Sequence, residues 1–324
     1  MNLIIIYSIT SSLLVAAISI FIKIAEKFNI IDQPNNRSSH KHVTIRGGGI
    51  IIFIGAILYS IFFGFTHPFF IIGLSLISII SFLDDLYDIY SIIRISVHFV
   101  AMILMFYDCG IYNFPWYYFV SALIVSTGII NAYNFMDGIN GITGGYSVIV
   151  IGSFWWINNH IHSFIDNNLL YVTIISLLIF NYFNFRKKAR CFAGDVGAVS
   201  IAFIIVFLMG KLIAETGDIS FLIILMLYGI DSILTIVHRL MLKENIFKAH
   251  RKHLYQIMSN ELRIPHTIVS LIYMLTQVVI MAGYFYFKDV SWIYFIATAI
   301  ILALIYILFM KRFFQLHINN IAYK

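Results

Sequence analysis

Charged residues are what this sequence has least of. Only 11% of its 324 residues are Asp, Glu, Lys or Arg, whereas a soluble domain carries about 25%. A chain with so few charges cannot cover a water-exposed surface with polar groups, and 61% of its residues are hydrophobic. The composition therefore excludes a soluble globule and indicates a protein whose solvent is lipid.

Cysteine is almost absent as well, with only Cys109 and Cys191. Neither belongs to a CxxC metal pattern, and we expect the two thiols on opposite sides of a membrane, where they cannot form a disulfide. Repeats of fixed period, low-complexity tracts and a soluble appendage are also lacking. We therefore predict one integral membrane domain over residues 1–324.

Long apolar runs follow one another along the chain. About 20 apolar residues span the hydrocarbon core, so we predict an all-α polytopic membrane protein with about ten or eleven transmembrane helices. The first run lacks the basic start and cleavage site of a signal peptide and is interpreted as a membrane helix. For runs 68–83 and 94–108 a tilted or partly interfacial position is the alternative. The predicted ranges are 3–22, 48–65, 68–83, 94–108, 116–134, 142–157, 168–185, 196–213, 219–238, 265–287 and 291–310.

The basic residues are distributed unevenly between alternate loops. Lys and Arg concentrate in cytoplasmic loops, and an outside N-terminus followed by eleven helices leaves only Lys211 and Lys288 outside. The polar loops then gather on the cytoplasmic face, which indicates that the protein acts there; a transporter is expected to place polar groups near the midplane. The inner loops hold Lys23, Lys27, Arg37, Lys41, Arg46, Arg94, Arg186, Lys187, Lys188, Arg190, Arg239, Lys243, Lys248, Arg251, Lys252, Arg263, Lys311, Arg312 and Lys324.

Three carboxylates, Asp84, Asp85 and Asp88, follow the third run. On a continuing helix Asp84 and Asp88 share one face, with Asp85 beside them. Their mutual repulsion requires a compensating cation, and unpaired charge is costly at a membrane boundary. A solvated helix end is the alternative interpretation.

A second polar group closes the fifth run. Asn131 and Asn134 face one way, and Asp137 follows them beside two glycines. A capped helix terminus is the alternative. Asp195 starts the eighth run, where it could serve as an N-cap, a role that does not exclude metal binding. Asp231 lies inside the ninth run, and we expect it to form a structural pair with a nearby cation.

Carboxylates without neighbouring His or Cys ligands suit a hard ion. Mg²⁺ takes oxygen ligands and completes its shell with water and substrate phosphates. Two basic loops, 32–49 and 248–256, accompany the carboxylates, and Arg and His side chains in them can bind phosphate oxygens. Ordinary positive loop charge is the alternative for the individual Lys residues. Gly47–Gly49 lacks the spacing of a phosphate loop and serves equally to start the second helix.

Five motifs occur in order on the predicted inner face. Together they resemble the polyprenyl-phosphate sugar-1-phosphate transferase superfamily, glycosyltransferase family 4, which includes the phospho-MurNAc-pentapeptide translocase and the WecA-type GlcNAc-1-phosphate transferases. The motifs are D-x-P-N-x-R-S-S-H at Asp32–His40, the pair Asp84-Asp85, N-x-x-N-x-x-D-G at Asn131–Gly138, F-x-G-D-x-G at Phe192–Gly197 and the His-rich loop at His250–His253.

The resemblance implies a helical bundle with a cytoplasmic active-site cleft and a Mg²⁺-dependent reaction, with Mn²⁺ as an alternative ion. By position, Asp84 and Asp85 match the acidic pair implicated in activating the lipid phosphate, and Asp195 with Asp137 matches the metal site. Phe192 matches an aromatic implicated in stacking on uracil. The other matching or neighbouring substrate-binding positions are Lys41, Asn131, Asn134, Asn140, Asn184, His250, Arg251 and His253.

Three departures from the family pattern bear on the donor. Asn140 stands where many members have a second Asp, and Val43-Thr44-Ile45 stands where prolines are usual. The loop His250–Gln256 reads His-Arg-Lys-His-Leu-Tyr-Gln and lacks the triple His of the pentapeptide translocase. This form resembles the branch that initiates O-antigen and other surface polysaccharides.

The resemblance therefore implies transfer of N-acetyl-hexosamine-1-phosphate from a UDP-sugar to polyprenyl (undecaprenyl) phosphate, with release of UMP. Peptidoglycan phospho-MurNAc-pentapeptide transfer and ion-coupled transport are the alternatives. We expect a multi-pass protein of the bacterial inner membrane that contacts the bilayer and no nucleic acid. A homodimer is one option for its oligomeric state.

Overall fold

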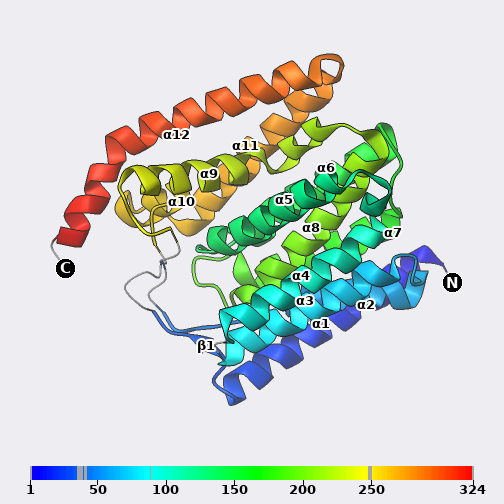
Figure 1. Cartoon of the computed structure of the whole chain (residues 1–324). Coiled ribbons are helices and arrows are strands. Elements are labelled where there is room, and N and C mark those ends of the chain that lie inside the picture. Colours follow the sequence, from blue (N-terminus) through cyan, green and yellow to red (C-terminus); the bar gives the residue numbers. More distant parts are fainter. Residues whose placement is uncertain (1, 35–38, 40–41, 88, 247–249, 323–324) are drawn as a thin grey trace.

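The computed structural model describes residues 2–34, 39, 42–87, 89–246 and 250–322, the last four of these by backbone alone. Helices dominate, and the described part pairs only two short strands, β1 (Ile31–Asp32) and β2 (Thr44–Ile45). The chain enters at one end of the bundle and leaves at the other (Figure 1). The α-helices are α1 (Leu3–Lys27), α2 (Ile50–Phe63), α3 (Pro68–Tyr87), α4 (Ser91–Asp108), α5 (Trp116–Met136), α6 (Ile142–His160), α7 (Asn167–Asn184), α8 (Gly194–Thr216), α9 (Met226–Met241), α10 (Leu254–Gln256), α11 (His266–Tyr286) and α12 (Ser291–Ala322). The shorter helical turns are η1 (Ile111–Asn113), η2 (Ile219–Leu225), η3 (Ile257–Glu261) and η4 (Lys288–Val290).

Every one of the eleven predicted ranges coincides with a helix, so the predicted all-α membrane bundle is confirmed. Within the described ranges, eight helices are long and apolar enough to cross a membrane, counting η2 and α9 together, and α2 is a shorter apolar helix. Both α3 and α4 are among the eight, with 20 and 18 residues, so their length does not require an interfacial position. The chain is therefore a multi-pass membrane protein.

Helix α8 lies at the centre of the bundle. It packs against α3, α5 and α2, and its side chains from Val196 to Met209 are all buried. A helix that is apolar on every side must bury every side. This central position fixes the N-terminus of α8, and with it Asp195, against the ends of the helices around it.

Glycines let α2 approach α8 at backbone contact. A Cβ on Gly49 would lie 2.4 Å from the Cα of Gly197, and a Cβ on Gly48 would lie 2.4 Å from the sulfur of Cys191. Both cysteines are buried free thiols, so they are not joined in a disulfide. The Gly47–Gly49 run thus serves close helix packing beside Asp195.

We expect Gly49→Ala to destabilise the protein by about 1–3 kcal/mol, because the added methyl group meets backbone that cannot move aside. Thermal unfolding in detergent micelles measures the effect. The matched control is Gly152→Ala in α6, where a Cβ meets nothing within 4 Å; there we expect no loss, because Ala favours a helix over Gly by about 1 kcal/mol. Equal midpoints for the two variants would contradict the packing role.

Candidate active site

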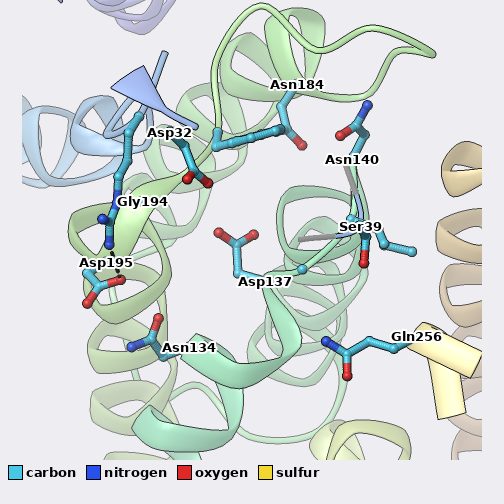
Figure 2. Close-up of a pocket in the computed structure, with 13 residues that line it drawn as sticks. Asp32, Ser39, Asn134, Asp137, Asn140, Asn184, Gly194, Asp195 and Gln256 are labelled. Atoms are coloured by element: carbon cyan, nitrogen blue, oxygen red, sulfur yellow. Dashed lines mark hydrogen bonds and ion pairs between the residues drawn. The ribbon is translucent and has the colours of Figure 1, made fainter. Parts of the chain in front are cut away.

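Residues from three of the five sequence motifs border one pocket at one end of the bundle. Its volume is about 290 Å³, and Asp137 lies in the middle of the labelled side chains around it (Figure 2). The lining comes from β1, the segment after β2, the end of α5 and the loop after it, the end of α7, the start of α8 and α10. The lining residues are Asp32, Ser39, Arg46, Asn134, Asp137, Gly138, Ile139, Asn140, Asn184, Phe192, Gly194, Asp195 and Gln256.

Asp137 ends α5 and points into the pocket (Figure 2). Its burial, the largest cause, raises the pKa of its carboxyl group to about 7. Asp195 and Asp32 raise that pKa further, while Thr143 and Arg46 lower it. No Lys or Arg of the described chain forms an ion pair with Asp137, so its negative charge lacks a direct partner.

Asp85 holds the N-terminus of α8. Its two carboxylate oxygens accept hydrogen bonds from the backbone N–H groups of Asp195 at 3.0 Å and Val196 at 3.1 Å. An anion is favoured there because the first N–H groups of a helix have no partner within the helix. Asp195 was a candidate N-cap of this helix, but its side chain makes no capping hydrogen bond. The side chain of Asp85 in α3 caps the helix instead.

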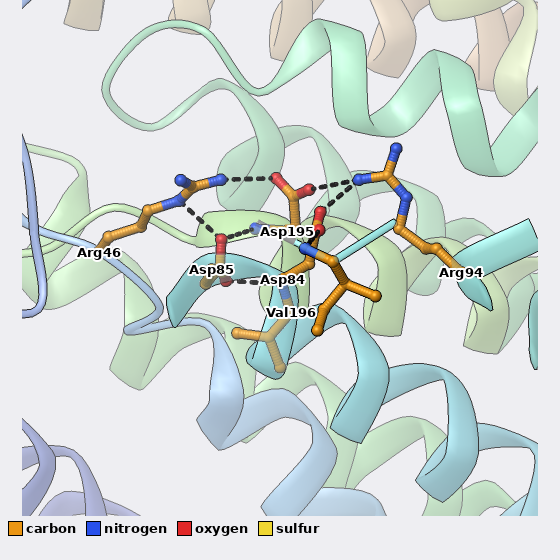
Figure 3. A network of polar contacts seen from close by, with 7 residues as sticks. Arg46, Asp84, Asp85, Arg94, Asp195 and Val196 are labelled. Atoms are coloured by element: carbon orange, nitrogen blue, oxygen red, sulfur yellow. Dashed lines mark hydrogen bonds and ion pairs between the residues drawn. The ribbon is translucent and has the colours of Figure 1, made fainter. Parts of the chain in front are cut away.

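Two arginines flank Asp195 from opposite sides (Figure 3). The guanidinium of Arg46 lies 2.6 Å from Asp85 Oδ1 and 3.1 Å from Asp195 Oδ1. Arg94 pairs with Asp84 and approaches Asp195 Oδ2 at 3.7 Å. These are the cations that the clustered carboxylates were predicted to require.

The first motif and the F-x-G-D-x-G motif are joined by backbone hydrogen bonds. Phe192 donates to the carbonyl oxygen of Ile45 at 2.8 Å, and Gly48 donates to the carbonyl oxygen of Phe192 at 2.8 Å. This pairing extends the β1–β2 hairpin onto the residues before α8. It places Arg46 against Asp195 and keeps Phe192 at the pocket edge.

Asn184 and Asn140 shape the loops around the pocket. Asn184 accepts a hydrogen bond from the Gly141 N–H at 2.7 Å and donates to the Cys191 carbonyl at 2.9 Å. Asn140 donates to the Arg186 carbonyl at 2.8 Å. Its side-chain oxygen is buried and has no hydrogen-bond partner among the described residues, so it remains available to a ligand.

Some predicted site residues lie elsewhere. Asn131 is exposed and donates to the Thr127 carbonyl of its own helix, so it does not line the pocket. Arg251 is paired with Glu261 at 3.1 Å. His250 and His253 lie beside the pocket, near the end of α5, and not in its lining. Lys41 and Asp88 fall outside the described residues.

Two contributors were not singled out from the sequence as site residues. Arg94 entered only as loop charge, although its place at the start of the helix after Asp84 was the available signal. Gln256 ended the basic loop without a role, yet it lines the pocket. Asp231, expected to pair with a nearby cation, contacts His253 at 3.3 Å, whereas Arg239 pairs with Glu244.

The oxygen donors around the pocket fit a hard divalent ion. Asp137 supplies a buried carboxylate without an ion-pair partner, and Asp195 and Asn134 lie on the same wall (Figure 2). Among the described residues, no three His, Cys, Asp or Glu side chains meet as a complete metal site. An ion bound here would therefore draw its remaining ligands from water and substrate, which is the usual habit of Mg²⁺.

The part of the chain that holds these acidic residues resembles known proteins. Residues 67–213, which carry Asp84, Asp85, Asp137 and Asp195, match the model of glycosyl transferase family 4. The chain is similar to a probable undecaprenyl-phosphate N-acetylglucosaminyl 1-phosphate transferase of Bacillus subtilis, with 26% identity over 76% of this chain and 75% of the relative. It is 23% identical to an undecaprenyl-phosphate alpha-N-acetylglucosaminyl 1-phosphate transferase of Thermotoga maritima, over 82% and 84% of the two chains.

A third relative has higher sequence identity, but over a much shorter part of the chain. The phospho-N-acetylmuramoyl-pentapeptide-transferase of Leuconostoc citreum is 36% identical over only 28% of each chain. The fold, the acidic site and the matches that span most of the chain define a multi-pass membrane transferase. The match of residues 67–213 to the glycosyl transferase family 4 model and the two long likenesses confirm the resemblance stated from the five motifs, including the branch.

Proposed function

We propose that this protein transfers N-acetyl-hexosamine-1-phosphate from a UDP-sugar to undecaprenyl phosphate and releases UMP. The observation that carries the proposal is the meeting of Asp137, Asp195 and Phe192 around one pocket. Carboxylates and an aromatic ring suit a nucleoside diphosphate and its metal ion. The names of the relatives from Bacillus subtilis and Thermotoga maritima support the same acceptor and the transfer of an N-acetylglucosaminyl 1-phosphate group.

The metal ion is proposed to be Mg²⁺, held by Asp137 and Asp195, with Mn²⁺ as a substitute. When bound, it would neutralise charge on the diphosphate. The chain's own contribution is positioning: Arg46 holds Asp195, and Asn134 and Asn140 border the donor's space. An oxygen of the lipid phosphate attacks the β-phosphorus of the UDP-sugar, the bond from that phosphorus to the bridging oxygen breaks, and UMP leaves.

Asp84 is the better candidate than Asp85 for contact with the acceptor phosphate. The side chain of Asp84 is 10% exposed and bound by Arg94, which is itself 35% exposed. The side chain of Asp85 is 0% exposed, and backbone N–H groups and Arg46 occupy its oxygens. Arg94 can bind an incoming phosphate, whereas Asp85 is a structural group.

The orientation and pathway are part of the proposal. The basic loops support a cytoplasmic site and an outside N-terminus in the inner membrane. The product would be the first lipid-linked sugar of a surface polysaccharide or cell-wall polymer. Transfer of a muramyl-pentapeptide is less well supported, because that likeness covers only 28% of the chain.

The test is incubation of the purified protein with undecaprenyl phosphate and labelled UDP-N-acetyl-hexosamines. The expected result is a labelled lipid diphosphate sugar and one UMP for each lipid product. Uptake of label into vesicles without UMP would instead indicate a transporter. Product formed only from the UDP-MurNAc-pentapeptide would instead assign the protein to peptidoglycan synthesis.

Removal of the metal ion has its own expected result. EDTA should abolish UMP release, because the clustered carboxylates would repel an uncompensated diphosphate. Mg²⁺ in excess of the chelator should restore the rate, and Mn²⁺ should restore part of it. Full activity in EDTA, with no divalent ion found in the protein, would contradict the metal assignment.

A further inference from the structure

A run of basic residues follows the end of α7. Residues 186–190 contain Arg186, Lys187, Lys188 and Arg190, and we call these four residues the basic edge. Lys187, Lys188 and Arg190 are exposed, and Arg186 is half-buried. None of the four lines the pocket or pairs with the carboxylates around Asp195. Their charges are thus not part of the active site described above.

The basic edge differs from other basic side chains of the protein in having no carboxylate beside it. Five others form ion pairs with Asp or Glu: Arg46, Arg94, Arg239, Arg251 and Lys252. Within the described residues, no ion pair involves any side chain of the basic edge. An uncompensated positive surface beside a membrane attracts the headgroups of anionic lipids.

The position of Arg186 places the basic edge at the membrane boundary. The outward face of α7 is apolar, with Leu178 55% exposed and Tyr182 65% exposed one turn later. In a membrane bundle such a face contacts lipid, and tyrosine is typical of the headgroup level. The guanidinium of Arg186 lies over the Tyr182 ring, 4.4 Å from its centroid, and Nε donates to the Tyr182 carbonyl. Tyr182 thus holds Arg186 where headgroups are expected to lie.

The backbone of the same segment supports the pocket. Asn140, which lines the pocket (Figure 2), donates through Nδ2 to the carbonyl oxygens of Arg186 at 2.8 Å and Lys187 at 3.4 Å. Gly141 has φ +83°, and a Cβ there would lie 1.6 Å from the ring of Phe185, so the two loops are in direct contact. The basic side chains therefore belong to a segment whose carbonyl groups hold a pocket residue.

We propose that the basic edge binds the headgroups of anionic phospholipids, and that the bound lipid steadies residues 185–190 against the pocket. The ligand is a phosphodiester with net negative charge, as in phosphatidylglycerol. Phosphatidylcholine carries its own cation beside the phosphate, so it binds more weakly. The lipid site itself does not depend on the proposed function; only its effect on the reaction rate rests on that function.

The decisive variant is Lys187→Gln/Lys188→Gln/Arg190→Gln in the full-length protein. In neutral detergent, native mass spectrometry counts the phosphatidylglycerol or phosphatidylcholine bound in separate titrations. The wild type should bind phosphatidylglycerol more tightly than phosphatidylcholine. The triple variant should bind phosphatidylglycerol about 100-fold more weakly, the loss expected for three basic side chains at an anionic surface. Equal phosphatidylglycerol binding by the wild type and this variant would overturn the lipid site.

Two controls separate a specific site from overall charge. Lys243→Gln/Lys311→Gln/Arg312→Gln removes the same charge from exposed positions on α12 and after α9, and should keep wild-type binding. Equal losses in the two triple variants would show a general charge effect and contradict the site. Lys187→Arg/Lys188→Arg keeps the charge and should also keep the binding. Because all these side chains are exposed, the thermal unfolding midpoints should match that of the wild type.

Undecaprenyl phosphate carries a related headgroup, so it is added as a competitor. Its mass distinguishes it from phosphatidylglycerol in the same spectrum. Because the basic edge lies outside the pocket lining, undecaprenyl phosphate at an equal concentration should leave phosphatidylglycerol bound. Displacement from the wild type would assign the basic edge to the acceptor and overturn its assignment to bilayer phospholipid.

The link to the pocket is tested by the rate of UMP release in nanodiscs. Phosphatidylglycerol mixed into phosphatidylcholine should raise the wild-type rate about fivefold, at the low end of the usual coupling between two sites. The triple variant of the basic edge should have the same rate in both membranes, equal to that of the wild type in phosphatidylcholine alone. Selective lipid binding without any change in rate would contradict the link to the pocket.

Failure of the lipid site and failure of the proposed function give different results. If the wild type forms no lipid-linked sugar, but only the triple variant of the basic edge loses phosphatidylglycerol, the proposed function fails and the lipid site stands. If the wild type forms the product and both proteins bind phosphatidylglycerol equally, the proposed function stands and the lipid site fails.

Discussion

Asp195→Asn is expected to lower UMP release by at least 10²–10³-fold, on the order of the loss when one preorganised electrostatic group is removed from an active site. Asp195 lies in the pocket wall, with Arg46 and Arg94 on its two oxygens. The amide keeps the shape of the side chain but cannot supply the negative charge that a metal ion or the paired arginines need. Initial rates of UMP release, with saturating donor and acceptor, measure the effect.

The matched control is Asp218→Asn, the same change near the other end of α8. Asp218 caps the start of η2 by accepting the Ser220 N–H at 2.8 Å, and Asn caps nearly as well as Asp. Its activity should equal that of the wild type. The unfolding midpoint of Asp195→Asn should stay close to the wild-type value, because the pair Arg46–Asp85 remains. A turnover near wild type in Asp195→Asn would remove Asp195 from the metal site.

Asp85→Ala is expected to unfold the protein at lower temperature, and to lose activity for that reason. The side chain of Asp85 is fully buried, accepts two N–H groups of α8 and lies 2.6 Å from Arg46. Its removal leaves two backbone N–H groups at the start of α8 without their acceptor, and a buried polar group left unsatisfied costs about 1–3 kcal/mol. Thermal unfolding in micelles should show this loss, and Asp85→Asn should lose less because its amide oxygen still accepts one N–H.

Asp84→Asn is the comparison that separates the two neighbours. Asp84 is 9% exposed, but its partner Arg94 has a side chain that is 35% exposed and can be hydrated, so the loss of Asp84 should cost less stability than the loss of Asp85. Its activity should nevertheless fall if it faces the acceptor phosphate. A stable Asp85→Ala protein without activity would instead assign the chemistry to Asp85 and contradict its structural role.

The bundle was predictable because lipid imposes a simple rule on the sequence. Backbone polar groups must be satisfied within each spanning segment, so each apolar run had to become a helix, and all eleven did. The end of α5 at Asp137 and the start of α8 at Asp195 were also predictable, because polar residues and glycines interrupt apolar runs there. Local composition suffices for such features.

The roles of individual site residues were less predictable. Asn131 and Asn134 were both predicted to bind substrate, yet only Asn134 lines the pocket, whereas Asn131 is exposed and bonded to its own helix. Their relative positions on α5 were clear, but the direction of the pocket was not. Asp231 was expected to pair with a cation close in sequence, and it contacts His253, 22 residues away.

By itself, the sequence determined that this protein is embedded in lipid, that its acidic and basic loops share one end of a helical bundle, and which five motifs resemble those of glycosyl transferase family 4. Only the tertiary structure decided which partner each charged side chain has. Asp85 accepts hydrogen bonds at the N-terminus of α8, Arg94 forms an ion pair with Asp84, and Asp231 contacts His253. Such pairings depend on distances between segments far apart in the chain, and hydrophobic pattern and residue spacing contain no information on those distances.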